Sequence, residues 1–126
     1  RGQMIGSFRS NNAKRKSIPD KCKKVHTLLQ RLFKAHFGRR FAAVRVNCRI
    51  KCKKHKDAKN VGVSTILGLG NYTGGQLKIY TKPTEFKAVS IKNRFVTFNS
   101  SKLAHSTAPF TGVRWSFVFF TNEIKK

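Results

Sequence analysis

The short sequence His55-Lys56-Asp57 places two metal-binding side chains two positions apart. Along an extended segment, residues two positions apart point to the same side of the chain. The imidazole and the carboxylate would then face one metal ion together. So short a pattern also arises by chance, and the alternative is a pair of exposed residues in a lysine-rich turn with no chemical role.

A second group of polar side chains lies near the C-terminal end, with His105 in the expected strand 103–108 and Arg114 in 112–121. Alternation in the last strand places on one side Arg114, Ser116, Val118 and Phe120, and on the other side Val113, Trp115, Phe117 and Phe119. Burying a guanidinium without an anion is costly, so Arg114 predicts a bound carboxylate, with the Ser116 hydroxyl as second donor. The alternatives are that His105 is a core histidine and that Arg114 pairs with Glu85 or Glu123.

One helix and eight strands are expected to position these residues. Apolar residues at helical spacing predict an amphipathic helix over about 19–37, ended by Gly38. From Phe41 onward the period is two, and turn residues separate the expected strands: 41–48, 50–55, 61–67, 76–80, 87–91, 94–99, 103–108 and 112–121. This order predicts a β-sandwich or barrel with a helix packed outside.

The basic segment 1–17 has no periodicity, so we expect a flexible arm before a single domain over 18–126. The glycine-rich stretch 68–75 lacks the spacing of a phosphate-binding loop, and no helix follows it. We interpret this stretch as a tight connection in which Gly74 and Gly75 adopt positive φ.

Three cysteines cannot all pair within one chain, which favours a reducing compartment. The spacings Cys22-x3-His26 and Cys48-x3-Cys52 could suit zinc on a helix. Two residues four apart on a strand lie too far from each other for one ion, so free thiols are the favoured interpretation for Cys48 and Cys52.

Two His and one carboxylate with open coordination positions form the facial triad of non-haem Fe(II) oxygenases. The sequence resembles the 2-oxoglutarate- and Fe(II)-dependent dioxygenases, in which H-x-D, a distal His and R-x-S follow in this order. Within them it resembles the nucleic-acid-modifying TET and J-binding-protein (JBP) branch. The segments that carry this resemblance are HKDAKNVGVSTILGLGNYTGGQLKIY (55–80) and LAHSTAPFTGVRWSFVFFT (103–121), and the likeness covers about 41–121. The chain is shorter than most members and lacks their insertions.

The resemblance implies a double-stranded β-helix (jelly-roll) fold and a role for each motif residue. His55, Asp57 and His105 would bind Fe(II). Arg114, assisted by Ser116, would bind the C5 carboxylate of the co-substrate 2-oxoglutarate, and Asn47 is a candidate for its C1 carboxylate. O2 would complete the reaction through a ferryl intermediate, with ascorbate as a possible reductant.

Charge indicates the partner. Lys and Arg number 28 against four acids, which gives a net charge of +24. Such a surface is typical of nucleic-acid binding, because each cation placed on a phosphate releases counterions. Lys51, Lys53, Lys54, Lys56 and Lys59 flank the His55-Lys56-Asp57 motif and predict a positive cavity mouth. Tyr72 and Trp115 are candidates for stacking on a base, although Trp115 fits a core position better.

No apolar run has the length of a membrane span, so we expect a soluble, intracellular monomer, with Lys14-Arg15-Lys16 as a candidate nuclear address. The predicted function is oxidation of a nucleic-acid base, 5-methylcytosine or thymine in DNA ahead of RNA. Two rivals stay open. One is a basic nucleic-acid-binding protein without catalysis, and the other is a 2-oxoglutarate oxygenase acting on a protein or a small molecule.

Overall fold

The computed structural model describes residues 3–9, 20–58 and 60–121, with backbone alone for 3–9 and 20–22. Its single helix within these ranges is α1, Asp20–Phe37. The strands are β1 Gln3–Arg9, β2 Ala43–Cys48, β3 Ser64–Leu69, β4 Tyr72–Gly74, β5 Leu77–Lys82, β6 Glu85–Val89, β7 Phe95–Phe98, β8 His105–Thr107, β9 Phe110–Gly112 and β10 Trp115–Phe120.

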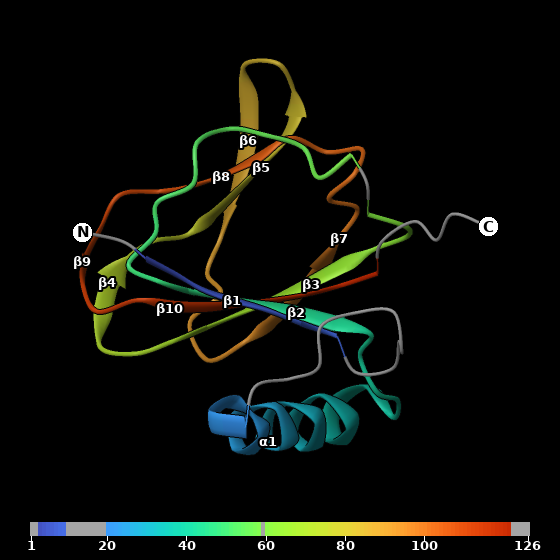
Figure 1. Ribbon diagram of the computed structural model, residues 1–126. Helices are drawn as coiled ribbons and strands as arrows, with labels where there is room; N and C mark the ends of the chain where they lie inside the picture. The colour runs from blue at the N-terminus through green and yellow to red at the C-terminus, as the bar shows by residue number, and fades with distance from the viewer. Residues whose placement is uncertain (1–2, 10–19, 59, 122–126) are drawn as a thin grey trace.

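Two sheets face each other, and α1 covers the outer side of the larger one (Figure 1). The larger sheet has the order β1-β2-β10-β3-β7, and the smaller has the order β6-β5-β8. The short pair β4 and β9 links the two sheets at one end. All strand pairs within these sheets are antiparallel. β5 and β6 form a hairpin, whereas β10 pairs with β2 and β3, and β8 with β5, across long stretches of chain, as in a barrel wound from two crossing halves.

Alternation along β2, β3 and β10 separates two cores, because successive side chains of a strand point to opposite faces. The core between α1 and the larger sheet contains Leu29, Phe33, Phe41, Val44, Val46, Leu67, Phe117 and Phe119. The core between the sheets is smaller and contains Ile66, Leu77 and Ile91, with Val118 packed against it. The predicted two-sided pattern of the last strand is therefore confirmed, and Trp115 packs against the helix-side core.

The predicted helix over about 19–37 is confirmed, and Gly38 ends it with φ of 74° and a hydrogen bond from its N–H to the Lys34 carbonyl. The apolar residues that predicted it are Val25, Leu28, Leu29, Leu32 and Phe33, and of these Leu29 and Phe33 are buried, whereas Val25, Leu28 and Leu32 are exposed. Gln30 takes a buried position instead, where its side-chain amide exchanges two hydrogen bonds of 3.1 Å with the backbone of Phe41. No helix in the described residues combines the length and the apolarity of a membrane crossing.

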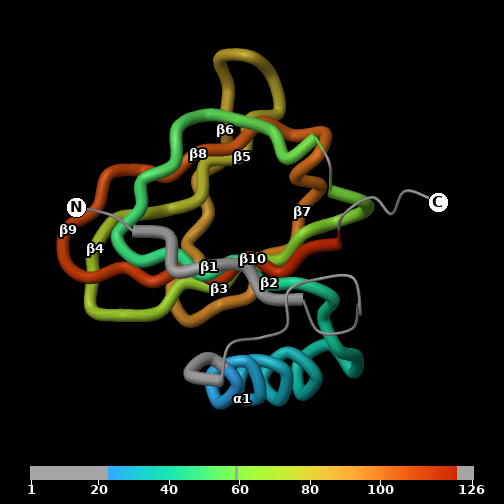
Figure 2. The backbone as a smooth tube through the Cα atoms, viewed as in Figure 1, coloured from blue at the N-terminus to red at the C-terminus, as the bar shows by residue number. Residues whose placement is uncertain are grey.

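The predicted strand 50–55 is wrong. After Arg49, whose φ is 60°, the chain runs beside β8 and meets it at Cys52, which pairs with Thr107, and at His55, which pairs with His105. The loop has one residue more between these two contacts than β8 has, so a regular ladder cannot form. Figure 2 shows this segment as a tube that passes along β8.

Two further segments differ from expectation. Where the sequence predicted an arm over 1–17, the structure pairs β1 with β2, and residues 10–17 lie outside the described ranges. A register shift between Met4 and Gly6 interrupts the pairing of β1 with β2. The expected turn at 68–75 contains the short strand β4, and Gly74 and Gly75 adopt the predicted positive φ, 77° and 67°.

Candidate metal centre

His55 and His105 lie directly opposite each other although the sequence separates them widely. Their backbones exchange two hydrogen bonds, from His55 N to His105 O at 3.0 Å and from His105 N to His55 O at 2.9 Å. Side chains opposite each other on adjacent antiparallel segments are close neighbours, and the two imidazole rings lie 4.3 Å apart. His105 is buried between the sheets, whereas His55 is exposed at the edge of the cavity.

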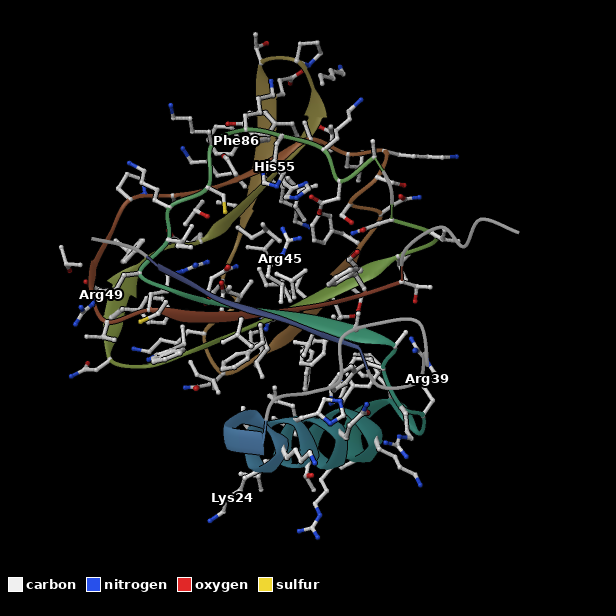
Figure 3. All side chains as sticks on the ribbon, in the orientation of Figure 1. Lys24, Arg39, Arg45, Arg49, His55 and Phe86 are labelled. Atoms are coloured by element: carbon white, nitrogen blue, oxygen red, sulfur yellow. The ribbon has the colours of Figure 1, made fainter. Side chains whose placement is uncertain are left out.

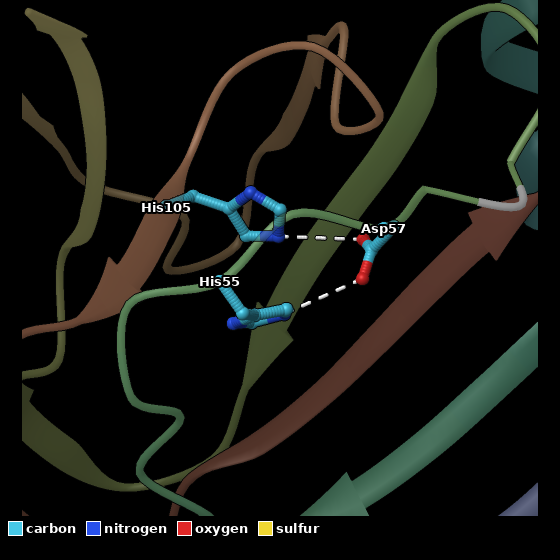
Figure 4. A group of neighbouring side chains, drawn as sticks. All are labelled: His55, Asp57 and His105. Carbon is cyan, nitrogen blue, oxygen red and sulfur yellow. Dashed lines mark ion pairs between the residues drawn. The ribbon is translucent and has the colours of Figure 1, made fainter.

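Asp57 completes the group, and Figure 4 shows its carboxylate between the two rings. Its Oδ1 lies 3.4 Å from His55 Nε2, and its Oδ2 lies 3.3 Å from His105 Nε2. One donor atom from each of the three residues falls within 4.8 Å of the others. The structure thus brings together the three residues that the sequence selected.

Both rings are oriented by the carbonyl two residues before them. His55 Nδ1 lies 2.6 Å from Lys53 O, and His105 Nδ1 lies 2.9 Å from Leu103 O. Because a carbonyl only accepts, we assign the proton to Nδ1 in each ring. In the neutral imidazole, Nε2 then turns a lone pair toward the Asp57 carboxylate. Two lone pairs and an anion directed at one point fit a divalent cation, which satisfies all three.

The Asp57 carboxyl is suited to remain ionised. Burial raises its pKa, but when both rings carry a second proton and no cation is bound, the hydrogen bond and positive charge of His105, followed by the charge of His55, outweigh this effect. The charge of Arg45 contributes in the same direction. The pKa therefore lies below its ordinary value, and the group can act as an anionic ligand at neutral pH.

A short polar network holds the Asp57 loop. The Asp57 N–H donates to Ser100 O at 2.9 Å, and Asn60 N–H donates to Asp57 O at 3.0 Å. The Ser100 hydroxyl is fully buried, lies 2.7 Å from the Ser64 hydroxyl and accepts from Asn60 Nδ2 at 3.3 Å. Asn60, Ser64 and Ser100 were not predicted as site residues, because no spacing rule connects isolated polar residues on a loop, on β3 and after β7.

Arg114 is buried, with 2% of its surface exposed, and it has no carboxylate partner among the described residues. Its Nε donates to Gly75 O at 3.2 Å, and its guanidinium carbon lies 5.8 Å from the Tyr72 ring and 5.6 Å from the Phe110 ring. Burial lowers the pKa of Arg114, which marks a desolvated cation. Glu85, one partner considered for it, pairs with Lys82 instead, and Glu123 lies outside the described residues.

Tyr72 has a different position from the predicted base-stacking one, because it is buried beside Arg114. Its hydroxyl proton has no acceptor among the described residues, because the Arg114 guanidinium beside it can only donate. Burial raises the pKa of this phenol, so the hydroxyl keeps its proton and can donate it to an acceptor. A buried cation and an unpartnered buried donor on neighbouring residues fit one carboxylate group.

One cavity of about 330 Å³ connects the metal-binding group to Arg114. It lies between the two sheets and is lined by Arg45, Asn47, Cys52, His55, Asp57, Ala58, Asn60, Ile66, Leu77, Phe98, His105, Ser106, Thr107, Arg114, Ser116, Val118 and Phe120. Its size falls at the lower end of the range of about 300–1,000 Å³ that is typical of small-molecule pockets. Asn47 and Ser116 are paired across β2 and β10, with Asn47 Nδ2 3.4 Å from Ser116 Oγ.

The cysteines show no zinc arrangement in the described part of the chain, where the three-residue group above is the one that can hold a metal. Cys48 and Cys52 are free and half-buried, as predicted. The side chain of Cys22 lies outside the described residues, and His26 packs its ring edge against Phe41 at 5.5 Å.

Comparisons with known proteins support the fold. No protein-family model matches the sequence, and a search of curated proteins found no match. Among solved structures, the chain is similar to an oxidoreductase of the 2OG-Fe(II) oxygenase family from Burkholderia pseudomallei, with 18% identity and a TM-score of 0.58 over 94% of this chain. It is also similar to a prolyl-4-hydroxylase from Pseudomonas putida, with 18% identity and a TM-score of 0.53 over 97% of this chain.

The chain covers 64% of the length of the first of these proteins and 70% of the second. The fold shared with these 2OG-Fe(II) oxygenases is the double-stranded β-helix, so the predicted fold class is confirmed. On this fold, His55, Asp57 and His105 form a group that can hold an iron ion at the mouth of the cavity between the two sheets.

Proposed function

We propose that this protein is an Fe(II)- and 2-oxoglutarate-dependent dioxygenase that oxidises a base in nucleic acid. The observation that carries the proposal is the cavity itself. It contains two His side chains and a carboxylate whose donor atoms lie within 4.8 Å of one another, and a buried arginine without a carboxylate partner among the described residues. The two features need two different ligands, a cation and an anion, and an iron-bound dicarboxylate supplies both.

The chain's own groups account for how the ligands would be held. The carbonyls of Lys53 and Leu103 fix both imidazole rings with Nε2 toward the metal, so little rotation is lost on binding. Arg114 and the Tyr72 hydroxyl would bind the distal carboxylate of the keto acid. Asn47 and Ser116 are donors within the same cavity for the remaining oxygens.

Bound Fe(II), 2-oxoglutarate and O2 would supply the oxidising chemistry. The protein would exclude water and direct the reacting C–H bond of the substrate toward the metal. His55 is exposed, with 41% of its side-chain surface accessible, whereas 8% of the His105 side chain is accessible. The substrate would therefore enter from the His55 side.

Charge supports a nucleic-acid substrate on that side. Arg49, Lys51, Lys53, Lys54 and Lys56 are all exposed along the loop that carries His55, and this loop contains no acid before Asp57. A polyanion would be attracted to such a mouth, and its binding would weaken steeply with salt. A methylated pyrimidine, 5-methylcytosine or thymine, is the proposed target, following the TET and JBP resemblance. It would be reached in a single strand or after base flipping.

Succinate formation from 2-oxoglutarate tests the proposal. The assay contains Fe(II), ascorbate and O2, with and without oligonucleotides that contain 5-methylcytosine, and it includes the double variant His55→Ala/Asp57→Ala. We expect turnover that the variant loses and that the methylated oligonucleotide stimulates. Nucleic-acid binding without succinate from any mixture would overturn the catalytic proposal and leave a basic binding protein.

The similarity to a prolyl-4-hydroxylase favours a second candidate, a 2-oxoglutarate oxygenase that acts on a protein. This candidate predicts keto-acid turnover that proline-containing peptides stimulate and nucleic acid does not. The same assay therefore separates the two candidates when a peptide is included as a further addition.

A further inference from the structure

The hairpin formed by β5 and β6 carries an exposed aromatic side chain within a cluster of lysines, outside the cavity. We propose that Phe86, Tyr80, Lys54 and Lys78, hereafter the hairpin platform, bind single-stranded nucleic acid by stacking a base on Phe86. This inference rests on the proposed function, because the role of the platform would be to hold the strand whose target base enters the cavity.

The platform is built from direct contacts. Tyr80 and Phe86 are paired across β5 and β6, and their ring centroids lie 5.3 Å apart. Lys78 Nζ lies 4.8 Å from the centre of the Phe86 ring, and Lys54 Nζ lies 4.2 Å from that of Tyr80. Two aromatic rings with an ammonium group at each combine stacking surface with phosphate charge, as in sequence-tolerant single-strand binding sites.

Phe86 has no evident structural reason to be exposed. In the described part of the chain six large hydrophobic side chains are exposed, and Phe86, at 47%, is the one aromatic among them. It lies on β6, an edge strand of the smaller sheet. Singly exposed apolar residues are common on protein surfaces, but this ring lies among lysines on an edge strand, and a planar ring is matched well by the face of a base.

The platform is joined to the metal centre through neighbouring residues. Lys54 directly precedes His55, and its Nζ donates to Pro83 O at 2.7 Å, which attaches the loop to the hairpin. The Tyr80 hydroxyl lies 3.4 Å from the hydroxyl of Ser106, which lines the cavity. Figure 3 shows Phe86 and His55 on the same side of the molecule, with Lys24 and Arg39 on the opposite side beside α1.

The positive charge around the hairpin platform favours a polyanionic partner. The hairpin contains Lys78, Lys82 and Lys87 and a single acid, Glu85, which is paired with Lys82 at 3.4 Å. Together with the five cations of the His55 loop, this surface is strongly positive. The α1 surface is also basic, but its exposed apolar residues are the aliphatic Val25, Leu28 and Leu32, which cannot stack on a base. The hairpin surface and the α1 surface are thus both basic, and α1 serves as a control surface whose exposed apolar residues cannot stack on a base.

Fluorescence anisotropy of the full chain with two labelled 12-residue oligomers tests the proposal. One oligomer is oligothymidylate and the other has the same phosphates with abasic sugars. Phe86→Ala should lower the affinity for oligothymidylate about tenfold and leave the affinity for the abasic oligomer unchanged, because only the former can stack. The matched control Leu28→Ala, which removes an exposed apolar side chain from α1, should change neither affinity.

The lysines give a second, independent readout. Lys54→Gln/Lys78→Gln should weaken binding of both oligomers and reduce the slope of log K against log salt concentration by about 0.7 per lysine. The α1 pair Lys24→Gln/Lys34→Gln should change the slope less. An equal effect of the two pairs would place the strand elsewhere and overturn the proposal.

Three further results would overturn it. They are an unchanged oligothymidylate affinity for Phe86→Ala, an equal loss for both oligomers, and competition by a polyglutamate peptide as effective as that by oligothymidylate. The last result would indicate an acidic protein surface as the partner. Thermal unfolding confirms that each variant is folded. Binding is measured without Fe(II) or 2-oxoglutarate, so a failure here and a failure of the oxygenase proposal appear in separate assays.

Discussion

The two faces of the larger sheet differ sharply although the same strands supply both. On β2 and β10, Val44, Val46, Phe117 and Phe119 point to α1 and form an apolar core with Phe33. The residues that alternate with them, Arg45, Asn47 and Ser116, line the cavity together with Arg114, which directly precedes β10. One face therefore provides stability, and the other provides charged and polar groups that a ligand would need.

This division has a physical cause. The helix-side core is dense with rings, since Phe33 contacts Phe37, Phe41, Phe95 and Phe119 at centroid separations of 4.5–6.1 Å. Such a core stabilises the sheet from one side and lets the opposite side retain a desolvated guanidinium. Substitutions on the two faces should therefore affect different quantities. Those toward α1 should change stability, and those toward the cavity should change ligand binding.

Phe33→Ala should have the largest effect on stability. The side chain is 2% exposed at the centre of the ring cluster, and its truncation leaves a cavity, so the free energy of unfolding should fall by about 3–5 kcal/mol. Leu32→Ala, at the exposed neighbouring position, should change it by less than about 0.5 kcal/mol. Urea unfolding measures both. A similar loss for the two variants would contradict the assignment of the helix faces.

Arg114→Met should weaken ligand binding and leave stability intact, the reverse of Phe33→Ala. Because the guanidinium is buried without a carboxylate partner, its removal should leave the stability of the ligand-free protein unchanged or raised. The affinity for 2-oxoglutarate should fall at least about thirtyfold, since a buried carboxylate would lose its charged partner. Arg94→Met, at an exposed position, is the control and should change neither quantity. A large loss of ligand-free stability would show that Arg114 is a structural residue.

Ser100→Ala should lower both the stability of the protein and its affinity for Fe(II), by less than the preceding variants. Loss of its hydroxyl leaves Ser64 and Asn60 without a partner they now share, and this should cost about 1–3 kcal/mol of stability. The Asp57 loop should loosen, and Fe(II) affinity should fall about tenfold, as for outer-shell partners of metal ligands. Ser90→Ala, at an exposed position, should change neither. Denaturation and metal titration measure the two effects. An unchanged metal affinity would show that the Ser100 network does not support metal binding.

The smallest expected effect is on the pH dependence of stability, through His26 on α1. Burial lowers the pKa of His26 below 6.5, and the positive charge of Arg40 lowers it further, so the folded protein favours the neutral ring. The stabilisation is complete above the unfolded-state pKa and is lost as the pH falls from about 6.5 toward the folded-state pKa. His26→Phe should therefore lose less stability than the wild type between pH 7 and pH 5 in urea unfolding. Equal losses would contradict this role of His26.

The sequence predicted much of this division because both faces follow from alternation. The pattern of β10 assigned Arg114 and Ser116 to one side and Phe117 and Phe119 to the other, and the structure confirms it. The helix bounds followed from apolar spacing and a terminal glycine. These signals are local, so a single sequence contains them.

What the sequence did not predict depends on contacts between distant segments. The strand expected over 50–55 fails because of one extra residue opposite β8, which no local pattern reveals. Tyr72 was expected to stack on a base, but it lies in the interior beside Arg114. The backbone carbonyls that orient His55 and His105 have no side-chain signature, and Gln30 is buried because it bonds to the backbone of Phe41.

The cavity should bind a cation at His55, Asp57 and His105 and a dicarboxylate at Arg114. Calorimetric titration without O2, first with Fe(II) and then with 2-oxoglutarate, tests this prediction most directly. We predict one equivalent of Fe(II) for the wild type and none for Asp57→Ala, and for Arg114→Met normal Fe(II) binding with greatly weakened 2-oxoglutarate binding. Absence of Fe(II) binding by the wild type, or equal binding by Asp57→Ala, would contradict the account.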